Sequence, residues 1–174
     1  MVAAWDTHYA KLDAPMAYGG DASYRHASEF MRGHGLVEDW GCGGGYLRTM
    51  IDGPYRGIDG SRTPFADVIA DLADYTSMAE CIVIRHVLEH SYRWQRILDN
   101  ACASFRSRLC VILFTPLAEE THVLQVEPDY CDVPVIAFRL TDLLERVPPE
   151  CEVAVEHVPG SFYGMETIIK AVRP

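Results

Sequence analysis

The chain carries a series of short apolar segments that predict buried strands. These segments span residues 36–40, 55–60, 67–72, 80–88 and 108–116. Each is apolar enough for a strand that is covered on both faces of a sheet, and each is too short for a core helix. We therefore expect these segments to form a mostly parallel sheet.

Amphipathic periodicity predicts helices around these strands. Residues 22–35 place apolar or aromatic side chains at positions 24, 27, 30 and 31 and end on a glycine, which is a common helix stop. Residues 91–105 place a second apolar stripe at positions 94, 97, 98, 101, 102 and 105. Residues 46–51 predict a short helix. The connections on either side of 67–72 are brief, so we expect the helices there to be stunted or absent.

The last part of the chain changes character. Residues 139–149 predict a helix capped by Thr141, and residues 151–158 and 164–172 predict two strands joined by a turn at 159–163. An antiparallel hairpin of this kind fits on the edge of an otherwise parallel sheet. The predicted fold class is therefore α/β, a three-layer sandwich with a mostly parallel seven-stranded sheet that ends in an antiparallel hairpin.

Length and charge narrow the class of protein. A chain of 174 residues suits one domain over residues 1–174. The net charge of −10 makes bulk nucleic acid an unfavourable partner, because such partners normally require a basic patch. No apolar run approaches the roughly 20 residues of a membrane span. The N-terminus lacks the pattern of a signal peptide, so we expect a cytoplasmic protein without a membrane partner.

The cysteines favour free thiols. None belongs to a CxxC pair, and several lie in apolar strand or helix patterns, which favours burial over zinc ligation or disulfide formation. The six cysteines are at positions 42, 81, 102, 110, 131 and 151.

A glycine-rich turn at 41–45 directly follows the strand predicted at 36–40. A strand that leads through glycines into a helix exposes backbone N–H groups at the carboxyl end of a parallel sheet, where nucleotide-like ligands bind. The dinucleotide fingerprint GxGxxG is not met, because its third glycine would fall at Tyr46. The phosphate-loop pattern is not met either, because no lysine follows the glycines.

The segment DWGCGGG at 39–45 resembles the acidic-x-Gly-x-Gly-x-Gly motif of the class I S-adenosylmethionine-dependent methyltransferases. The resemblance implies the Rossmann-like methyltransferase fold and S-adenosyl-L-methionine as the cofactor, with the turn passing close to its methionine part. It also implies that Asp39 contacts the cofactor's amino group, directly or through water. The cofactor-binding residues implied in this turn are Asp39, Gly41, Cys42, Gly43 and Gly45.

Two further strand ends resemble the family's pattern. Asp59, followed by Gly60, lies twenty residues after Asp39, where the family carries an acid that accepts hydrogen bonds from both ribose hydroxyls. The alternative is a turn aspartate before the glycine. Asp71 and Leu72 resemble the adenine site, in which an acid takes the exocyclic amine and the next residue faces the ring. The aspartates at 67 and 74 lie near enough in sequence to compete for this role.

The segment IVIRHVLEH resembles the strand-end segment HVLEH that many family members place beside the methyl group. Arg85 then falls among the cofactor-binding residues. His86 is the candidate catalytic residue, a base for a hydroxyl acceptor, because imidazole can take a proton near neutral pH. The alternative is a histidine that only shapes the pocket. Glu89 and His90 are candidates for the substrate side.

The chain also departs from the family's pattern. It has little room for full helices between its second and fourth strands or for a cap over the substrate. Residues 1–35 are therefore expected to act as a lid, with Tyr18 and Tyr24 as contacts or, alternatively, as packing on the sheet. A homodimer or a partner chain would also cover an open site. The cofactor-binding half is placed at 36–117 and the substrate-side loop, helix and hairpin at 118–174.

Residues 114–130 predict a loop on the substrate side of the sheet. Glu119 and His122 are its candidate substrate contacts, and Glu127 follows them. The spacing of these groups does not indicate a metal site, so we expect solvated loop acids and no metal.

We therefore expect an S-adenosylmethionine-dependent methyltransferase that O-methylates a small molecule or glycan. The O-directed part depends on His86 and on the lack of an NPPY-like amine-methylating motif. Two alternatives stay open: a non-catalytic cofactor-binding or partner subunit, and a nicotinamide-dependent oxidoreductase, against which Tyr46 counts. The sequence does not identify the methyl acceptor.

Overall fold

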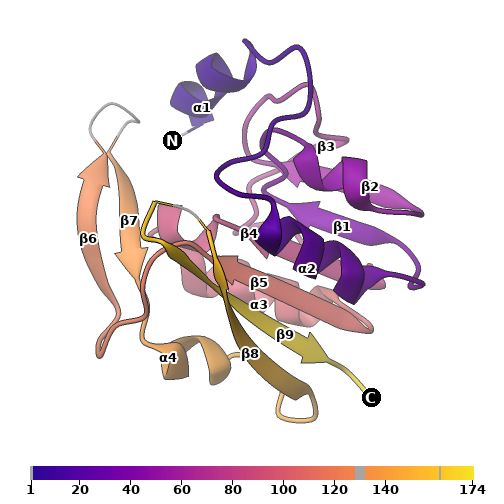
Figure 1. Cartoon of the computed structure of the whole chain (residues 1–174), viewed down its shortest axis with the longest axis vertical. Helices are drawn as coiled ribbons and strands as arrows, with labels where there is room; N and C mark the ends of the chain where they lie inside the picture. The colour runs from indigo at the N-terminus through magenta and orange to yellow at the C-terminus, as the bar shows by residue number, and fades with distance from the viewer. Residues whose placement is uncertain (1, 128–131, 161) are drawn as a thin grey trace.

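The computed structural model, which describes residues 2–127, 132–160 and 162–174, has a seven-stranded sheet at its centre (Figure 1). Its strands are β1 (Val37–Trp40), β2 (Tyr55–Asp59), β3 (Val68–Ile69), β4 (Cys81–Arg85), β5 (Arg108–Leu113), β8 (Glu152–Pro159) and β9 (Met165–Val172). The strand order is β3-β2-β1-β4-β5-β9-β8. Pairing is parallel from β3 to β5, whereas β9 is antiparallel to both β5 and β8. The predicted fold class, including the terminal hairpin, is confirmed.

Helices cover both faces of this sheet. Helix α2 (Ala22–Met31) packs on one face, and α3 (Trp94–Ser104) and α4 (Leu140–Leu144) pack on the other. Helix α1 (Val2–Tyr9) lies beyond the carboxyl ends of the parallel strands (Figure 1). The central strand β4 shows how the layers form: Ile82 and Ile84 join the core cluster that includes α3, while Cys81 and Val83 join the cluster that includes α2. Successive side chains of a strand point to opposite faces, so a strand covered on both sides is apolar throughout.

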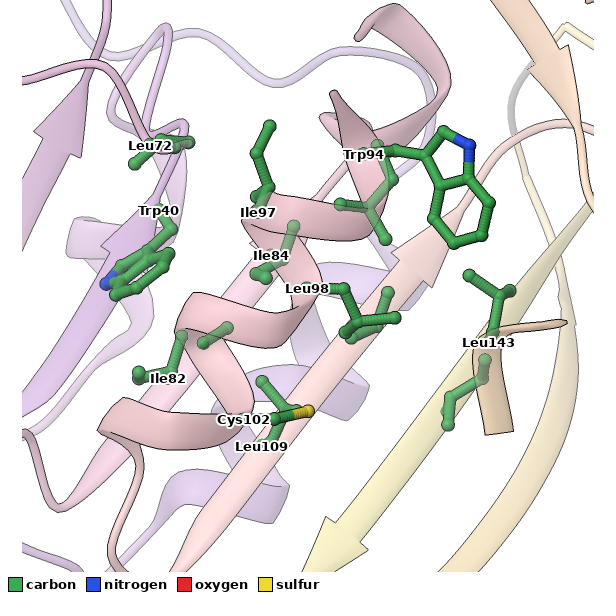
Figure 2. Close-up of a cluster of buried hydrophobic side chains, with 14 of the residues drawn as sticks. Trp40, Leu72, Ile82, Ile84, Trp94, Ile97, Leu98, Cys102, Leu109 and Leu143 are labelled. Atoms are coloured by element: carbon green, nitrogen blue, oxygen red, sulfur yellow. The ribbon is translucent and has the colours of Figure 1, made fainter. Parts of the chain in front are cut away.

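Helix α3 packs its predicted apolar stripe against the sheet. Figure 2 shows Trp94, Ile97 and Leu98 on the side of the helix that faces the sheet residues Ile84 and Leu109. Burying a large apolar side chain of this kind stabilises a fold by about 1.5–3 kcal/mol. The stripe predicted from the periodicity is buried at every position, namely 94, 97, 98, 101, 102 and 105.

The short helix predicted at residues 46–51 is present as the 3₁₀ helix η1 (Tyr46–Met50). Two local predictions need correction. Strand β3 has two residues instead of the predicted six, because only Val68 and Ile69 pair with β2. The cap predicted at Thr141 is wrong, because α4 begins at Leu140 after Arg139 and has no side-chain cap.

The predicted loop at 114–130 is wrong in part, because residues 122–127 form a strand. Strands β6 (His122–Glu127) and β7 (Val133–Ala137) make a separate two-stranded antiparallel sheet (Figure 1). β7 is buried along its length, whereas β6 is mostly exposed. An exposed strand gains little from apolar alternation, so its sequence carries no clear strand pattern.

The segment between β2 and β4 lacks full helices, as predicted. Residues 60–80 contain turns and β3 but no α-helix.

The helices of the described chain include none that is long and apolar enough to cross a membrane. Cys42, Cys81, Cys102 and Cys110 are buried free thiols, and Cys151 is partly buried. Cys131 lies outside the described residues.

Candidate functional site

A cavity of about 580 Å³ opens where the parallel strands end. Its walls include residues directly after the carboxyl ends of β1, β2, β3, β4 and β5, together with residues from α1, from β6 and from the turn between β8 and β9. In open α/β sheets this edge is where ligands bind. A second void, lined only by apolar residues under α3, measures about 10 Å³, which is too small for a ligand.

The glycine turn after β1 forms the part of the cavity wall that lies next to α1. Gly41 and Gly43 have positive φ angles of 84° and 47°, which disfavour other residues. A Cβ at Gly43 would lie 2.9 Å from the hydroxyl of Tyr9, and one at Gly45 would lie 2.5 Å from Cβ of Phe65. Gly41, Cys42 and Gly43 line the cavity, whereas Gly45 packs behind it.

Asp59 is held firmly at the end of β2. Its Oδ2 accepts a hydrogen bond from Gly43 N–H at 2.9 Å, and its Oδ1 accepts one from Ser61 N–H at 2.7 Å. A carboxylate has about four lone-pair sites, so each oxygen retains capacity for a ligand hydroxyl. Burial raises the pKa of Asp59, and the two backbone donors oppose that shift. Gly60, the next residue, also lines the cavity.

Asp39 provides a second buried carboxylate at the end of the neighbouring strand β1. It is 4% exposed, and its Oδ2 accepts a hydrogen bond from the hydroxyl of Tyr55 at 2.6 Å. Burial, helped by the nearby Asp59 and opposed by the hydrogen bond from Tyr55, raises the pKa of Asp39 to about 6. A cationic group bound here would favour the ionised form of both acids.

Asp71 and Leu72 line the cavity beyond β3. Leu72 is buried, while Asp71 is exposed and forms an ion pair with Arg93 at 3.0 Å. The competing Asp67 lies elsewhere, because its carboxylate accepts a hydrogen bond from Gly57 N–H at 2.7 Å on the outer side of β2. The other competitor, at position 74, is absent from the cavity walls.

Arg85 connects three parts of the chain at the end of β4. Its guanidinium donates to the hydroxyls of Ser23 and Tyr24 at 3.0 and 2.9 Å, to the carbonyl of Tyr18 at 2.9 Å and to Glu166 at 3.0 Å. It also lies over the ring of Tyr24, 3.9 Å from the centroid. Four of its five N–H donors are therefore used, so little remains for a cofactor.

His86 faces the cavity from an unusual backbone position. Its φ of 56° lies in the left-handed region, which costs a non-glycine residue conformational energy. Its Nε2 lies 3.1 Å from Oε1 of Glu166, but the alignment does not make a good hydrogen bond. Burial lowers the pKa of His86 to about 4, although Glu166 opposes this shift, so the ring is neutral at neutral pH.

The two other polar residues of the HVLEH segment have different surroundings. Glu89, in the 3₁₀ turn η2 (Leu88–His90), is fully buried and does not line the cavity, which corrects its expected place on the substrate side. Its Oε1 accepts a hydrogen bond from Phe114 N–H at 2.6 Å. His90 does line the cavity; its Nδ1 lies 3.1 Å from the carbonyl oxygen of Pro134, and burial lowers its pKa.

Tyr18 and Tyr24 both line the cavity. The Tyr18 hydroxyl lies 2.7 Å from Nε2 of His8, which joins α1 to the segment that precedes α2. Glu119 and His122 do not line the cavity, although the sequence suggested them, because both are exposed on its outer side.

Several wall residues were missed by sequence reasoning. Four come from segments whose place in the fold is not evident from local pattern: Trp5 and Tyr9 in α1, Phe114 after β5, and Tyr163 after β8. Their aromatic character was the available signal. Gln125 of β6 and Phe162 were missed as well. Glu127 also lines the cavity, and it belongs to the segment that was predicted to lie on the substrate side. The described residues contain no cluster of three potential metal-binding side chains.

Comparison with known proteins gives structural matches only. No protein-family model matches the chain, and no curated protein matches it in sequence. A 1,6-didemethyltoxoflavin-N1-methyltransferase from Burkholderia thailandensis, solved with 1,6-didemethyltoxoflavin and S-adenosylhomocysteine, matches with a TM-score of 0.65 and 13% identity, over 87% of this chain and 76% of that chain.

Two further solved structures agree. The magnesium protoporphyrin IX methyltransferase from Synechocystis PCC 6803, with bound S-adenosylmethionine, matches with a TM-score of 0.62 and 17% identity, over 87% of this chain and 76% of that chain. A chain of the Haloferax volcanii complex that contains the Trm112 methyltransferase activator matches with a TM-score of 0.62 and 12% identity, over 88% of this chain and 91% of that chain. The chain thus has the Rossmann-like fold of the class I S-adenosylmethionine-dependent methyltransferases.

Proposed function

We propose that the chain is an S-adenosylmethionine-dependent methyltransferase. The observation that carries the proposal is the pair of buried carboxylates, Asp39 and Asp59, at the ends of adjacent parallel strands and facing one cavity across the glycine turn. Burying a carboxylate costs free energy unless a partner compensates for it. Two such groups in one cavity wall support a ligand that carries both a cation and hydroxyl donors.

The residues present fit this cofactor. Asp39 would hold its amino group, and Asp59 would accept hydrogen bonds from the ribose hydroxyls. Asp71 and Leu72 would take the adenine. The cavity volume of about 580 Å³ lies within the roughly 300–1,000 Å³ of small-molecule sites. The bound cofactor supplies an electrophilic methyl group, so the protein needs mainly to align an acceptor and exclude water.

The acceptor in this proposal is a hydroxyl group of a small molecule or glycan. His86 supports this part by its position, because its ring lies at the cavity wall and is neutral at neutral pH, so a ring nitrogen can accept a hydrogen bond from the hydroxyl. Its pKa of about 4 makes it a weak base, which counts against full proton transfer to the ring. His86 directly follows β4 and is the first residue of the HVLEH segment. A partner chain or a second copy would then complete the wall that the missing helices leave open.

Calorimetric titration with S-adenosylmethionine and S-adenosylhomocysteine tests the cofactor. Both should bind the wild-type protein, and Asp59→Asn should weaken them at least about 10-fold, because a hydrogen bond to a charged group contributes about 1.5–3 kcal/mol. Asp52→Ala removes an exposed carboxylate away from the cavity and serves as the control. Circular dichroism should show both variants folded.

The same experiment separates the alternatives. NADH binding in place of the sulfur compounds would favour the oxidoreductase. No binding to a folded sample would overturn the proposed cofactor. Binding without turnover of any acceptor would favour a non-catalytic or partner subunit.

A further inference from the structure

Aromatic rings from four separate segments converge at one end of the cavity. Phe114, after β5, is central: its ring centroid lies 5.0 Å from that of His86, 5.2 Å from that of His90 and 6.1 Å from that of Tyr163. Trp5 of α1 extends the group, 5.9 Å from His90. Centroid distances of about 4.5–7 Å are those of interacting aromatic pairs. We call these five residues the aromatic wall.

The aromatic wall is distinct from the end of the cavity that carries Asp39 and Asp59. Its rings follow β4 and β5 or come from α1 and the β8–β9 turn, whereas the two acids follow β1 and β2. His86 belongs to the wall, so the wall lies beside the candidate base. A molecule that stacks on Phe114 would therefore present its substituents to His86.

The positively charged side chains among the described residues of the cavity walls are already paired with acids. Among the described residues that line the cavity the cations are Arg85 and Arg93, and both are engaged: Arg85 with Glu166 at 3.0 Å, and Arg93 with Asp71 at 3.0 Å. Burial lowers the pKa values of the two histidines of the wall, so neither supplies a positive charge at neutral pH. A bound anion would find no unpaired cation in these walls.

Several polar groups at this end are already engaged: His90 Nδ1 lies 3.1 Å from the Pro134 carbonyl oxygen, and His86 Nε2 lies 3.1 Å from Oε1 of Glu166. Gln125 and Glu127 of β6 are the polar side chains that face the wall from that strand, and they bond to each other at 2.6 Å. A glycan ring carries hydroxyls on all sides and needs several such partners when it is buried. A planar ring instead gains from stacking on Phe114 and Tyr163, whose planes differ by 25°.

From this geometry we propose that the aromatic wall binds the methyl acceptor and that the acceptor is a planar aromatic molecule without negative charge. The inference rests on the proposed function for the identity of the ligand as a methyl acceptor. The aromatic wall as a binding site does not depend on the cofactor.

Ligand-observed NMR titration tests the proposal with defined probes. The protein is first saturated with S-adenosylhomocysteine and then titrated with 2-naphthol, decahydro-2-naphthol, 2-naphthoate and methyl β-glucopyranoside. 2-Naphthol should bind most tightly, about 10-fold more tightly than its saturated analogue, because one or two aromatic contacts correspond to about 2–12-fold each. 2-Naphthoate should bind at least about 10-fold more weakly than 2-naphthol.

Two variants test the assignment to the wall. Phe114→Leu and Tyr163→Leu keep apolar volume but remove a ring, and each should weaken 2-naphthol by about 2–12-fold with little effect on decahydro-2-naphthol. Tyr163 is 37% exposed, so its variant should fold even if the one at the more buried Phe114 does not. Tyr92→Leu removes an exposed ring outside the cavity and should change neither probe.

The outcomes separate this inference from the proposed function. Failure of S-adenosylhomocysteine to bind overturns the cofactor, and the probes are then titrated into the protein alone, where the same order of affinities is still expected. Equal binding of 2-naphthol and its saturated analogue, tighter binding of the glucoside or the naphthoate, or no 2-naphthol binding would each overturn the aromatic acceptor. Wild-type affinity of both wall variants for 2-naphthol would also overturn the assignment of the acceptor to the aromatic wall.

Discussion

The buried acid Glu89 should make the protein less stable as the pH rises. Its side chain is fully buried, Oε1 accepts a hydrogen bond from Phe114 N–H at 2.6 Å, and Oε2 has no hydrogen-bond partner. Burial raises the pKa of Glu89 from an ordinary 4.5 to about 8. At neutral pH the folded protein therefore keeps this carboxyl protonated, whereas the unfolded chain ionises it.

The size of the effect follows from proton linkage. Between pH 4.5 and about 8 the folded state binds a proton at Glu89 that the unfolded state has lost, so stability falls with pH across this window. Each pH unit corresponds to about 1.4 kcal/mol, and the pKa difference of 8 minus 4.5 gives a total of roughly 5 kcal/mol. Below pH 4.5 both states are protonated and the contribution is constant.

Glu89→Gln removes this titration and keeps the shape of the side chain. Urea unfolding of the wild type and the variant, at pH values from about 5 to 8, should give a free-energy difference that moves in favour of the variant by roughly 4 kcal/mol across the series. Glu119→Gln changes an exposed carboxylate and serves as the control. A difference between wild type and Glu89→Gln that is independent of pH, or that moves toward the wild type, would refute the reasoning.

Three further results are expected. Gly43→Ala should destabilise the fold by about 1–2 kcal/mol in urea unfolding, because φ is 47° and the Cβ would meet the Tyr9 hydroxyl; Tyr9→Phe should recover part of the loss, and an unchanged midpoint for Gly43→Ala would contradict this. Arg85→Met should cost about 3–5 kcal/mol by leaving Glu166 buried without its partner, and adding Glu166→Gln should restore stability; a double variant no better than the single would contradict it. His86→Gln should lower kcat for an identified acceptor about 100-fold or more while S-adenosylhomocysteine affinity stays within about threefold; unchanged kcat would remove the base assignment.

The positions of the central strands in the sequence were predictable, because each of these strands is buried on both faces of the sheet. β4 and β5 read as continuous apolar runs, and the stripe of α3 follows the helical period, so local pattern and tertiary burial agree there. The predicted length of β3 was too great, because Ala70 and Leu72 are apolar for packing against the core and do not pair with β2.

The β6–β7 sheet could not be predicted from local pattern. β6 is exposed on both sides, so its residues have no buried face to set an alternation. β7 pairs with β6 across the intervening segment, and its burial depends on the turn η2 and on neighbours distant in sequence. Long-range pairing of this kind leaves little trace in a short window of sequence.

The same distinction applies to the site. Asp39 and Asp59 were predicted from the resemblance to the methyltransferase motif and its spacing, and the structure has both at strand ends. The cluster of Arg85, His86 and Glu166 was not predicted, because Glu166 lies on β9 and is 81 residues from Arg85. Only the antiparallel pairing of β9 with β5 brings its carboxylate to the end of β4.

The glycine turn would need its glycines even without a ligand. A Cβ at Gly41 would lie 2.2 Å from Cγ2 of Val87, and one at Gly44 would lie 2.6 Å from the carbonyl oxygen of Met16. The N-terminal segment packs directly on this turn, where Met16 N–H donates to the Gly44 carbonyl at 2.9 Å. The glycines therefore serve the fold as well as any ligand.

The buried acids are harder to explain by folding alone. Asp59 accepts backbone N–H groups that a smaller polar side chain could also satisfy. Asp39 is buried with a raised pKa, and its side chain accepts a hydrogen bond from the Tyr55 hydroxyl. Keeping two carboxylates side by side in one wall costs stability through desolvation and mutual repulsion. A cation and hydroxyl donors bound in the cavity would offset that cost, which is why the proposed cofactor depends on these two residues more than on the glycines beside them.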